Sequence, residues 1–473
     1  MILFAKKHSG EKKLIVNNDY DVIIAGSGPS GSTLAYFLSQ KKSYKVAVFD
    51  SRSWEDLWGK PCGNAIGKHH FFELGIPEPQ GDEIKQTVTG ISIISPSEHV
   101  EFRIYGEGYI IDRKKFGTRL LKTAVDNGVE FYPRTQVLGP VFENAKLAGI
   151  KVKINDKIEE FKGKIIVDAT GTAGVIRRYL PKEWPVSEEL DPKDSDIAYR
   201  EIVKLNYEIK EPSILKIYLN QKVSPGGYWW YFPEGIDSAN IGLGVQGGMG
   251  YPNPKLIYEN LLSKRPEIRS KKEVISSGGA QVPTRRPLDS LVWDNFIAIG
   301  DSAFAVNPVH GGGMGYAMIS AYWASKGIEN AFEKGEPNRF NLWITNVGYM
   351  KMIGTKQASL ELTRMFLQRL SDEELDFIME KKIVDENDVD ILGRKGELNE
   401  SAIEKSVKIV SDFFKILKMT SKPSLLLKLR TLSTFMNKMK NAYNEYPETP
   451  YGLSRWKENV AEILKNFKAE IKA

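Results

Sequence analysis

The segment from Tyr20 to Asp50 constrains the fold of this chain more than any other part of it. Residues 20–25 form an apolar run that predicts a buried parallel strand, and a helix of small residues is expected over 32–38. A second strand, 45–49, ends in Asp50. The turn between the first strand and the helix reads GSGPSG, which in this strand–turn–helix–strand context is the fingerprint of a dinucleotide-binding unit.

Each residue of this fingerprint has its own expected role. Gly26 permits the tight turn, Gly28 lets the backbone approach a pyrophosphate, and Gly31 lets helix and strand pack closely. The helix N-terminus supplies free N–H groups for the phosphates. Asp50 can accept a hydrogen bond from a ribose hydroxyl. The fingerprint therefore predicts a dinucleotide cofactor, and it does not distinguish a nicotinamide from a flavin.

A second pattern, far along the chain, points to a flavin. A strand over 295–299 leads to Asp301, and the stretch NPVHGGGMG at 307–315 then opens a helix. This order resembles the ribityl and isoalloxazine half of the FAD site in flavoproteins with one Rossmann-type domain. Backbone N–H groups near 312–314 would face the flavin N1 and C2 carbonyl, where the reduced ring collects negative charge. With the strand 165–171 that returns to the cofactor, the candidates here are Gly171, Asp301, Gly311, Gly312, Gly313 and Met314.

Length and composition exclude several other classes. A chain of 473 residues is expected to form two or three domains, and its single cysteine excludes a disulfide framework and a thiolate metal cluster. The five histidines show no zinc-ligand spacing, so no metal is predicted, and the adjacent His69 and His70 are expected at a helix surface. No run approaches the roughly 18 apolar residues of a membrane-spanning helix, and the N-terminus lacks a signal-peptide pattern. We therefore expect a cytoplasmic protein.

Residues 403–440 are strongly basic, with nine Lys or Arg and two acidic residues. Apolar residues recur there at helical spacing. A basic amphipathic helix pair can lie on an anionic bilayer, whereas a helical domain packed on the core with a solvated basic face has the same pattern. Both interpretations stay open. No nucleic-acid partner is predicted, because no recognised binding module accompanies the charge.

The order of elements predicts an α/β chain in four parts. Residues 1–19 form an N-terminal extension. The cofactor-binding domain is discontinuous, 20–184 and 281–340, with part of the substrate sheet near 90–110. Residues 185–280 are expected to form a largely antiparallel substrate domain, and 341–473 a helical C-terminal domain.

Two further motifs narrow the class. The first is KPCG at 60–63, and the second is PGGYWWYFP at 225–233, followed by GLG at 242–244. Together they resemble the P-x-x-Y-x-W-x-F-P…G-x-G signature and P-x-C-G-type loop of geranylgeranyl reductases. These are FAD enzymes that saturate double bonds of isoprenoid chains. The resemblance covers most of 20–440 and looks closest to the archaeal digeranylgeranylglycerophospholipid reductases.

This resemblance implies a fold, a substrate and a set of contacts. The fold would be a Rossmann-like FAD-binding domain of the p-hydroxybenzoate hydroxylase type, with an antiparallel substrate sheet and a helical C-terminal region. The substrate would be a geranylgeranylated membrane-lipid precursor, met at the inner face of the cell membrane. An unidentified donor, reduced ferredoxin or NAD(P)H, would supply electrons. The positions that carry over as FAD contacts are Ser30, Asp50, Cys62, Gly63, Arg113, Val137, Asp301, Gly313 and Met314.

The aromatic motif itself predicts a surface for an apolar chain. Tyr228, Trp230 and Phe232 alternate along a strand and so share one face. Gly242 and Gly244 on a neighbouring strand leave room for something that lies against that face. An aromatic tunnel beside a flavin and an ordinary buried aromatic core both fit these five residues.

Two roles are possible for Cys62, and two for the pair Arg285 and Arg286. An isolated alkene needs a proton as well as a hydride, and the Cys62 thiol or an ordered water could supply it, while a cysteine that only shapes the loop is the alternative. Arg285 and Arg286 could hold an anionic head group or form surface ion pairs. For the whole chain, a flavin-dependent aromatic hydroxylase and an electron-transfer flavoprotein are the competing functions.

Overall fold

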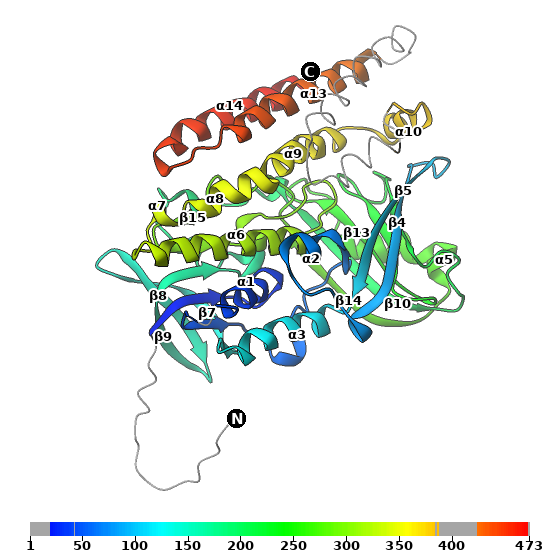
Figure 1. Ribbon diagram of the computed structural model, residues 1–473. Coiled ribbons are helices and arrows are strands. Elements are labelled where there is room, and N and C mark those ends of the chain that lie inside the picture. The colour runs from blue at the N-terminus through cyan, green and yellow to red at the C-terminus, as the bar shows by residue number, and fades with distance from the viewer. Residues whose placement is uncertain (1–18, 42, 384–385, 387–422, 472–473) are drawn as a thin grey trace.

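The computed structural model describes residues 19–41, 43–383, 386 and 423–471. Within this part of the chain, two eight-stranded sheets lie side by side, and helices pack between them and over one edge (Figure 1). The first sheet carries the dinucleotide fingerprint, and the second carries the aromatic motif.

The first sheet has the order β15-β16-β9-β1-β2-β6, with β7 and β8 as an antiparallel extension of β9. The strands β1, β2, β6, β9 and β16 run parallel. Val22, Ile23 and Ile24 of β1 are fully buried, as expected for a central parallel strand that is covered on both faces. The bounds are β1 Asp19–Ala25, β2 Val46–Phe49, β6 Glu130–Tyr132, β7 Gln136–Glu143, β8 Lys146–Ile154, β9 Lys157–Asp168, β15 Val292–Trp293 and β16 Phe296–Ala298.

The second sheet has the order β14-β10-β13-β12-β11-β4-β5-β3 and is antiparallel except between β11 and β4. Three of its strands come from the early part of the chain, before residue 112, so this sheet is assembled from two separate segments. The bounds are β3 Ala65–Gly67, β4 Ile84–Ile94, β5 Glu101–Ile111, β10 Asp196–Leu205, β11 Ile214–Tyr218, β12 Trp229–Pro233, β13 Ser238–Gln246 and β14 Lys271–Val282.

Helices complete the two layers. The first helix starts with Pro29 at its first turn, a position where proline costs no hydrogen bond. Between α8 and α9 the helix passes through a π-helical turn, Met350–Gly354. The bounds are α1 Pro29–Ser39, α2 His69–Leu74, α3 Arg113–Asp126, α4 Pro254–Asn260, α5 Pro266–Arg269, α6 Met314–Glu333, α7 Arg339–Leu342, α8 Ile344–Tyr349, α9 Thr355–Leu367, α10 Asp372–Glu380, α13 Pro423–Asn444 and α14 Leu453–Glu470.

The C-terminal helices α13 and α14 form a pair that lies over α8 and α9 (Figure 1). Leu425, Leu429, Phe435 and Met439 of α13 are buried, so the apolar face of this helix is covered by protein. Residues 403–422 of the basic segment lie outside the described residues. Among the described helices, each is too short or too polar to cross a bilayer.

Candidate active site

One continuous cavity of about 2790 Å³ runs between the two sheets and continues beneath the C-terminal helices. Its volume exceeds the roughly 300–1,000 Å³ of a common small-molecule pocket several-fold. The cavity therefore has room for a dinucleotide and a second long molecule. Of the residues predicted to contact the cofactor or the prenyl chain, the lining contains all except Gly31 and Gly242.

The three fingerprint glycines occupy different surroundings. A Cβ on Gly31 would lie 1.9 Å from the Gly26 carbonyl oxygen, and Gly26 has a φ of +103° with the Ala169 carbonyl oxygen 2.3 Å from its Cβ position. These two glycines allow helix, turn and strand to pack. Around Gly28, by contrast, nothing lies within 4 Å of the Cβ position. That open cradle at the start of α1 fits a pyrophosphate.

Asp50 is held in place at the end of β2. Its Oδ2 accepts hydrogen bonds from the backbone N–H and the hydroxyl of Ser27, both at 2.7 Å, and its Oδ1 accepts from the Arg52 N–H at 2.8 Å. The carboxylate lines the cavity next to the Gly28 cradle. This position suits the ribose contact expected from the sequence.

The Gly-rich loop at 307–313 closes the other end of the cofactor region. Gly311 has a φ of +65°, and the Nδ1 of His310 accepts a hydrogen bond from the Gly312 N–H at 3.1 Å. Asp301 lies behind this loop, where its Oδ2 pairs with Lys60 Nζ at 3.1 Å. The buried Arg113 donates to the Lys60 carbonyl, which fixes the loop that leads to Cys62.

The remaining cofactor candidates line the same region. Ser30 lies at the start of α1, close to Gly300: a Cβ on Gly300 would come within 2.5 Å of its hydroxyl oxygen. Gly171 has a φ of +72° and open space at its Cβ position. Val137, Gly313 and Met314 also contribute to the lining.

The aromatic residues form a wall of the cavity. Tyr228, Trp230 and Phe232 lie on one face of the second sheet, with ring centroids 6.0 and 6.1 Å apart. The two glycines behind them differ. A Cβ on Gly244 would meet only the Cβ of Asp196, at 3.9 Å, whereas a Cβ on Gly242 would lie 2.4 Å from the Trp230 ring, so Gly242 makes room for that ring. Gly244 therefore faces the cavity, whereas Gly242 is covered by the Trp230 ring.

Cys62 lies at the edge of this wall and is half-buried. The Asn240 side-chain amide donates to the Cys62 carbonyl at 2.8 Å and to Glu234 at 3.2 Å, and its oxygen accepts from the Trp230 indole N–H at 3.0 Å. Burial raises the pKa of Glu234, although Asn64, Asn240 and Arg200 oppose that shift. Asn240 and Glu234 were missed from the sequence, because nothing in a single strand sequence shows that they meet the loop 60–64.

An apolar arm extends the cavity away from the cofactor region. It runs between the second sheet and the helices α9, α10 and α13, which also bring Arg364 and Lys440 into the cavity lining. Its apolar residues are Leu215, Ile217, Leu219, Leu360, Phe366, Leu367, Leu375, Ile378, Met379, Leu429, Leu432 and Met436. Such a surface suits a long hydrocarbon chain.

The expectation for His69 and His70 is wrong in part. His69 is exposed, but His70 packs against Gly315 at the start of α6, and burial lowers its pKa to about 3. The ligand atoms of His69, His70 and Glu73 lie within 4.8 Å of one another, an arrangement that sequence spacing had not indicated. The positive charge of Lys356 also lowers the pKa of both imidazoles. This charge opposes cation binding, and the absence of a metal stays a prediction.

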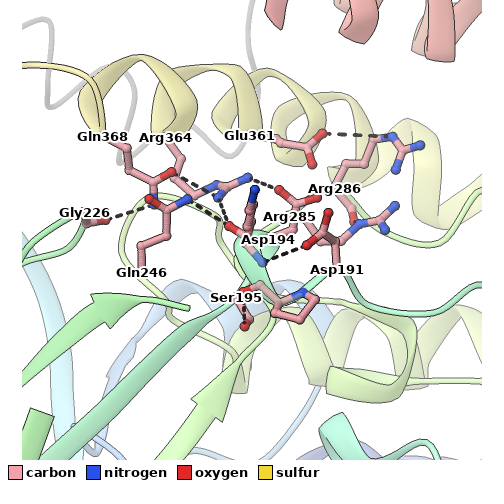
Figure 2. A network of polar contacts seen from close by, with 12 residues as sticks. Asp191, Asp194, Ser195, Gly226, Gln246, Arg285, Arg286, Glu361, Arg364 and Gln368 are labelled. Carbon is pink, nitrogen blue, oxygen red and sulfur yellow. Dashed lines mark hydrogen bonds and ion pairs between the residues drawn. The ribbon is translucent and has the colours of Figure 1, made fainter. Parts of the chain in front are cut away.

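Arg285 and Arg286 form neither of the two arrangements expected from the sequence. Both are buried and lie outside the cavity lining: Arg285 pairs with Glu188 at 2.7 Å, and Arg286 approaches Asp289 at 3.3 Å and Glu361 at 4.0 Å. They belong to a network at the junction of the second sheet and α9 (Figure 2). Its role is to hold these elements together, since breaking a buried ion pair leaves an uncompensated charge.

The fold is of the FAD-binding Rossmann type that flavin-dependent enzymes share. The structure is similar to a geranylgeranyl bacteriochlorophyll reductase-like protein from Thermoplasma acidophilum, with a TM-score of 0.73 at 22% identity over 88% of this chain and 99% of that one. It is also similar to a flavin-dependent brominase, with a TM-score of 0.64 at 17% identity over 84% of this chain and 100% of that one. At these identities the likeness concerns the fold alone.

Sequence comparison narrows the class to one family. Residues 194–282 match the model of the geranylgeranyl reductase catalytic domain. The chain is 41% identical over 451 residues to digeranylgeranylglycerophospholipid reductase of Sulfolobus acidocaldarius, covering 95% of this chain and 98% of that one. A second relative, digeranylgeranylglycerophospholipid reductase 2 of Methanopyrus kandleri, is 25% identical over 376 residues, or 76% and 90% of the two chains. The chain belongs to the geranylgeranyl reductase family.

Proposed function

We propose that this protein uses FAD to saturate isolated double bonds in the geranylgeranyl chains of isoprenoid lipids, with precursors of archaeal membrane ether lipids as the substrate class. The observation that carries the proposal is the continuity of the cavity. The Gly28 cradle and the Gly-rich loop bound one end, the aromatic wall lies in the middle, and the apolar arm leads away from it. A cofactor and a long apolar chain can thus meet at the aromatic wall.

The open Gly28 cradle and the fixed Asp50 support FAD as the cofactor. When bound, the flavin supplies the hydride for one alkene carbon. The chain's own residues bind the prenyl group along the apolar arm, exclude water from it, and provide a proton for the second carbon. Cys62 is our proposed donor at the edge of the aromatic wall, and an ordered water there is the alternative.

The same proposal assigns a location and an electron source. We expect the basic face of α13 to approach the anionic inner face of the cell membrane, from which the lipid enters. Reduced ferredoxin or NAD(P)H would reduce the flavin. The large apolar arm favours a prenyl chain over the compact ring of an aromatic hydroxylase substrate, and it would have no use in a protein that only transfers electrons.

The test mixes the chemically reduced protein with a geranylgeranylated lipid without oxygen and follows the mass of the lipid. Mass gains in steps of two hydrogens are expected. The variant Gly244→Leu places a side chain in the open space of the aromatic wall and should retain FAD while losing these gains. A lipid of unchanged mass in the presence of reduced, FAD-loaded protein would contradict the proposal.

A further inference from the structure

Asp196, the first residue of β10, lines the cavity next to the Gly-rich loop. It pairs in register with Val282 of β14, whose Cγ1 lies 3.7 Å from the Cβ position of Gly311. On the same cavity face, the Tyr228 hydroxyl donates to the His310 carbonyl at 2.6 Å. Asp196 therefore lies beside the loop that is expected to hold the flavin ring.

The Asp196 carboxyl group has few partners that would stabilise its negative charge. Its Oδ1 is buried and has no hydrogen-bond partner among the described residues, and the same holds for Thr284 Oγ1 and Arg364 Nε. Arg364, the guanidinium whose charge acts on Asp196, is already engaged: it pairs with Asp194 at 2.8 Å and donates to the Lys193 carbonyl at 3.1 Å (Figure 2). Asp196 is half-buried, and the Arg364 charge and the Thr284 hydroxyl oppose the effect of burial, so the carboxyl group can exist both ionised and protonated.

The surrounding groups set the proton affinity of Asp196. Burial raises its pKa to about 7, while Arg364 and Thr284 oppose the shift. Asp194 stays ionised, because Arg364 holds its pKa below the usual range despite burial. Burial raises the pKa of Tyr228 and lowers that of His310 to about 4, so both are neutral near pH 7. Asp196 is thus a group on this wall whose charge changes near neutrality.

We propose that Asp196 is a redox-linked proton site, which takes up a proton when the bound flavin is reduced and gives it up when substrate oxidises the flavin. This inference rests on the proposed function in that FAD must fill the cavity. Two electrons from the donor and one proton convert FAD to its anionic reduced form, and a second proton converts the Asp196 carboxylate to the acid. The negative charge of the reduced ring favours that protonation.

Oxidation of the flavin by the alkene releases the same proton. A hydride passes from the reduced flavin to one alkene carbon, and the other carbon receives a proton. Asp196 returns to the carboxylate as the net source of that proton. The Tyr228 hydroxyl lies on the same cavity face, within electrostatic influence of both Asp196 and Cys62.

The test is a reductive titration with dithionite at a series of pH values, which gives the flavin midpoint potential without any lipid. For a two-electron couple, each proton taken up shifts this potential by about 30 mV per tenfold change in proton concentration. Above pH 7, where Asp196 is ionised beside the oxidised flavin, the slope of the parent should therefore approach twice that of Asp196→Asn. The exposed Asp191→Asn, a matched removal of one carboxylate outside the cavity lining, should keep the parental slope.

Equal slopes for the parent and Asp196→Asn would overturn the proposal. Since no lipid is present, a failure of alkene reduction leaves this result unaffected, whereas a protein that takes up no FAD refutes both proposals. If Asp196→Asn loses its flavin, the infrared difference spectrum of the parent decides. A carboxylic acid band that appears on reduction and shifts in heavy water supports the proton site, and its absence overturns it.

Discussion

Replacing Gly28 and Gly31 by alanine should separate cofactor binding from folding within one turn. Gly28 has φ −66° and ψ −171°, which alanine adopts without strain, and its Cβ would meet nothing within 4 Å. Such a Gly→Ala change stabilises a protein by about 0.4–1 kcal/mol, because the unfolded chain loses freedom. The apoprotein of Gly28→Ala should therefore be at least as stable as the parent.

Its affinity for FAD should nevertheless fall. The new methyl group occupies the cradle proposed for the pyrophosphate, and overfilling a packed site costs about 1–3 kcal/mol. That cost corresponds to a roughly 5- to 150-fold weaker dissociation constant. At Gly31 the reverse is expected: the Cβ would lie 1.9 Å from the Gly26 carbonyl oxygen, so the backbone must move and the apoprotein loses on the order of 1–3 kcal/mol of stability or more.

Two assays check the pair. Denaturant unfolding of the apoproteins measures stability, and titration of FAD fluorescence measures binding. If Gly28→Ala binds FAD as tightly as the parent, the pyrophosphate does not lie at that cradle. If Gly31→Ala is as stable as the parent, the close contact between α1 and the Gly26 turn does not contribute to stability.

Three further predictions follow from the site. Cys62→Ser should retain FAD and slow oxidation of the reduced flavin by a prenyl substrate about a hundredfold or more; a rate within about threefold of the parent, in an anaerobic stopped-flow experiment, would remove the thiol from the reaction. Burial lowers the pKa of His70 to about 3 and of His310 to about 4, both below the usual 6.5. Between pH 6.5 and 4 these imidazoles are protonated in the unfolded chain and neutral in the folded protein, so thermal stability should fall as the pH drops through this range. The variant His70→Gln should show a weaker dependence of thermal stability on pH. Neutralising Lys415 and Lys418 should weaken binding to anionic vesicles by about 1 kcal/mol per charge at low salt, with activity on a short, water-soluble prenyl substrate unchanged; unchanged vesicle binding would make the segment structural.

Local patterns predicted the cofactor half of the molecule well. The strand–turn–helix–strand order of residues 20–50 appears as β1, α1 and β2, because the apolar run, the glycines and Pro29 all favour the same local structure. The face shared by Tyr228, Trp230 and Phe232 was also predicted correctly, since side-chain alternation is a property of any strand.

Features that depend on distant contacts could not be predicted. Gly242 and Gly244 look alike in the sequence, yet one accommodates the Trp230 ring and the other faces the cavity. Arg285 and Arg286 were expected at the surface or at a head group, because the sequence alone does not show that Glu188 and Glu361, from separate segments, lie beside them. The apolar arm is formed by helices that follow β11, the strand they face, by more than a hundred residues. The Arg364 charge that acts on Asp196 comes from one of these helices, α9.

The central claim is that reduced flavin in this cavity transfers its hydride directly to a prenyl double bond. The most direct measurement is an anaerobic single turnover in which the flavin absorbance and the mass of a geranylgeranylated lipid are followed in the same sample. The account predicts that one double bond disappears for each flavin reoxidised, with a gain of two hydrogens in the lipid. Flavin that stays reduced, or flavin that reoxidises while the lipid mass is unchanged, would contradict it.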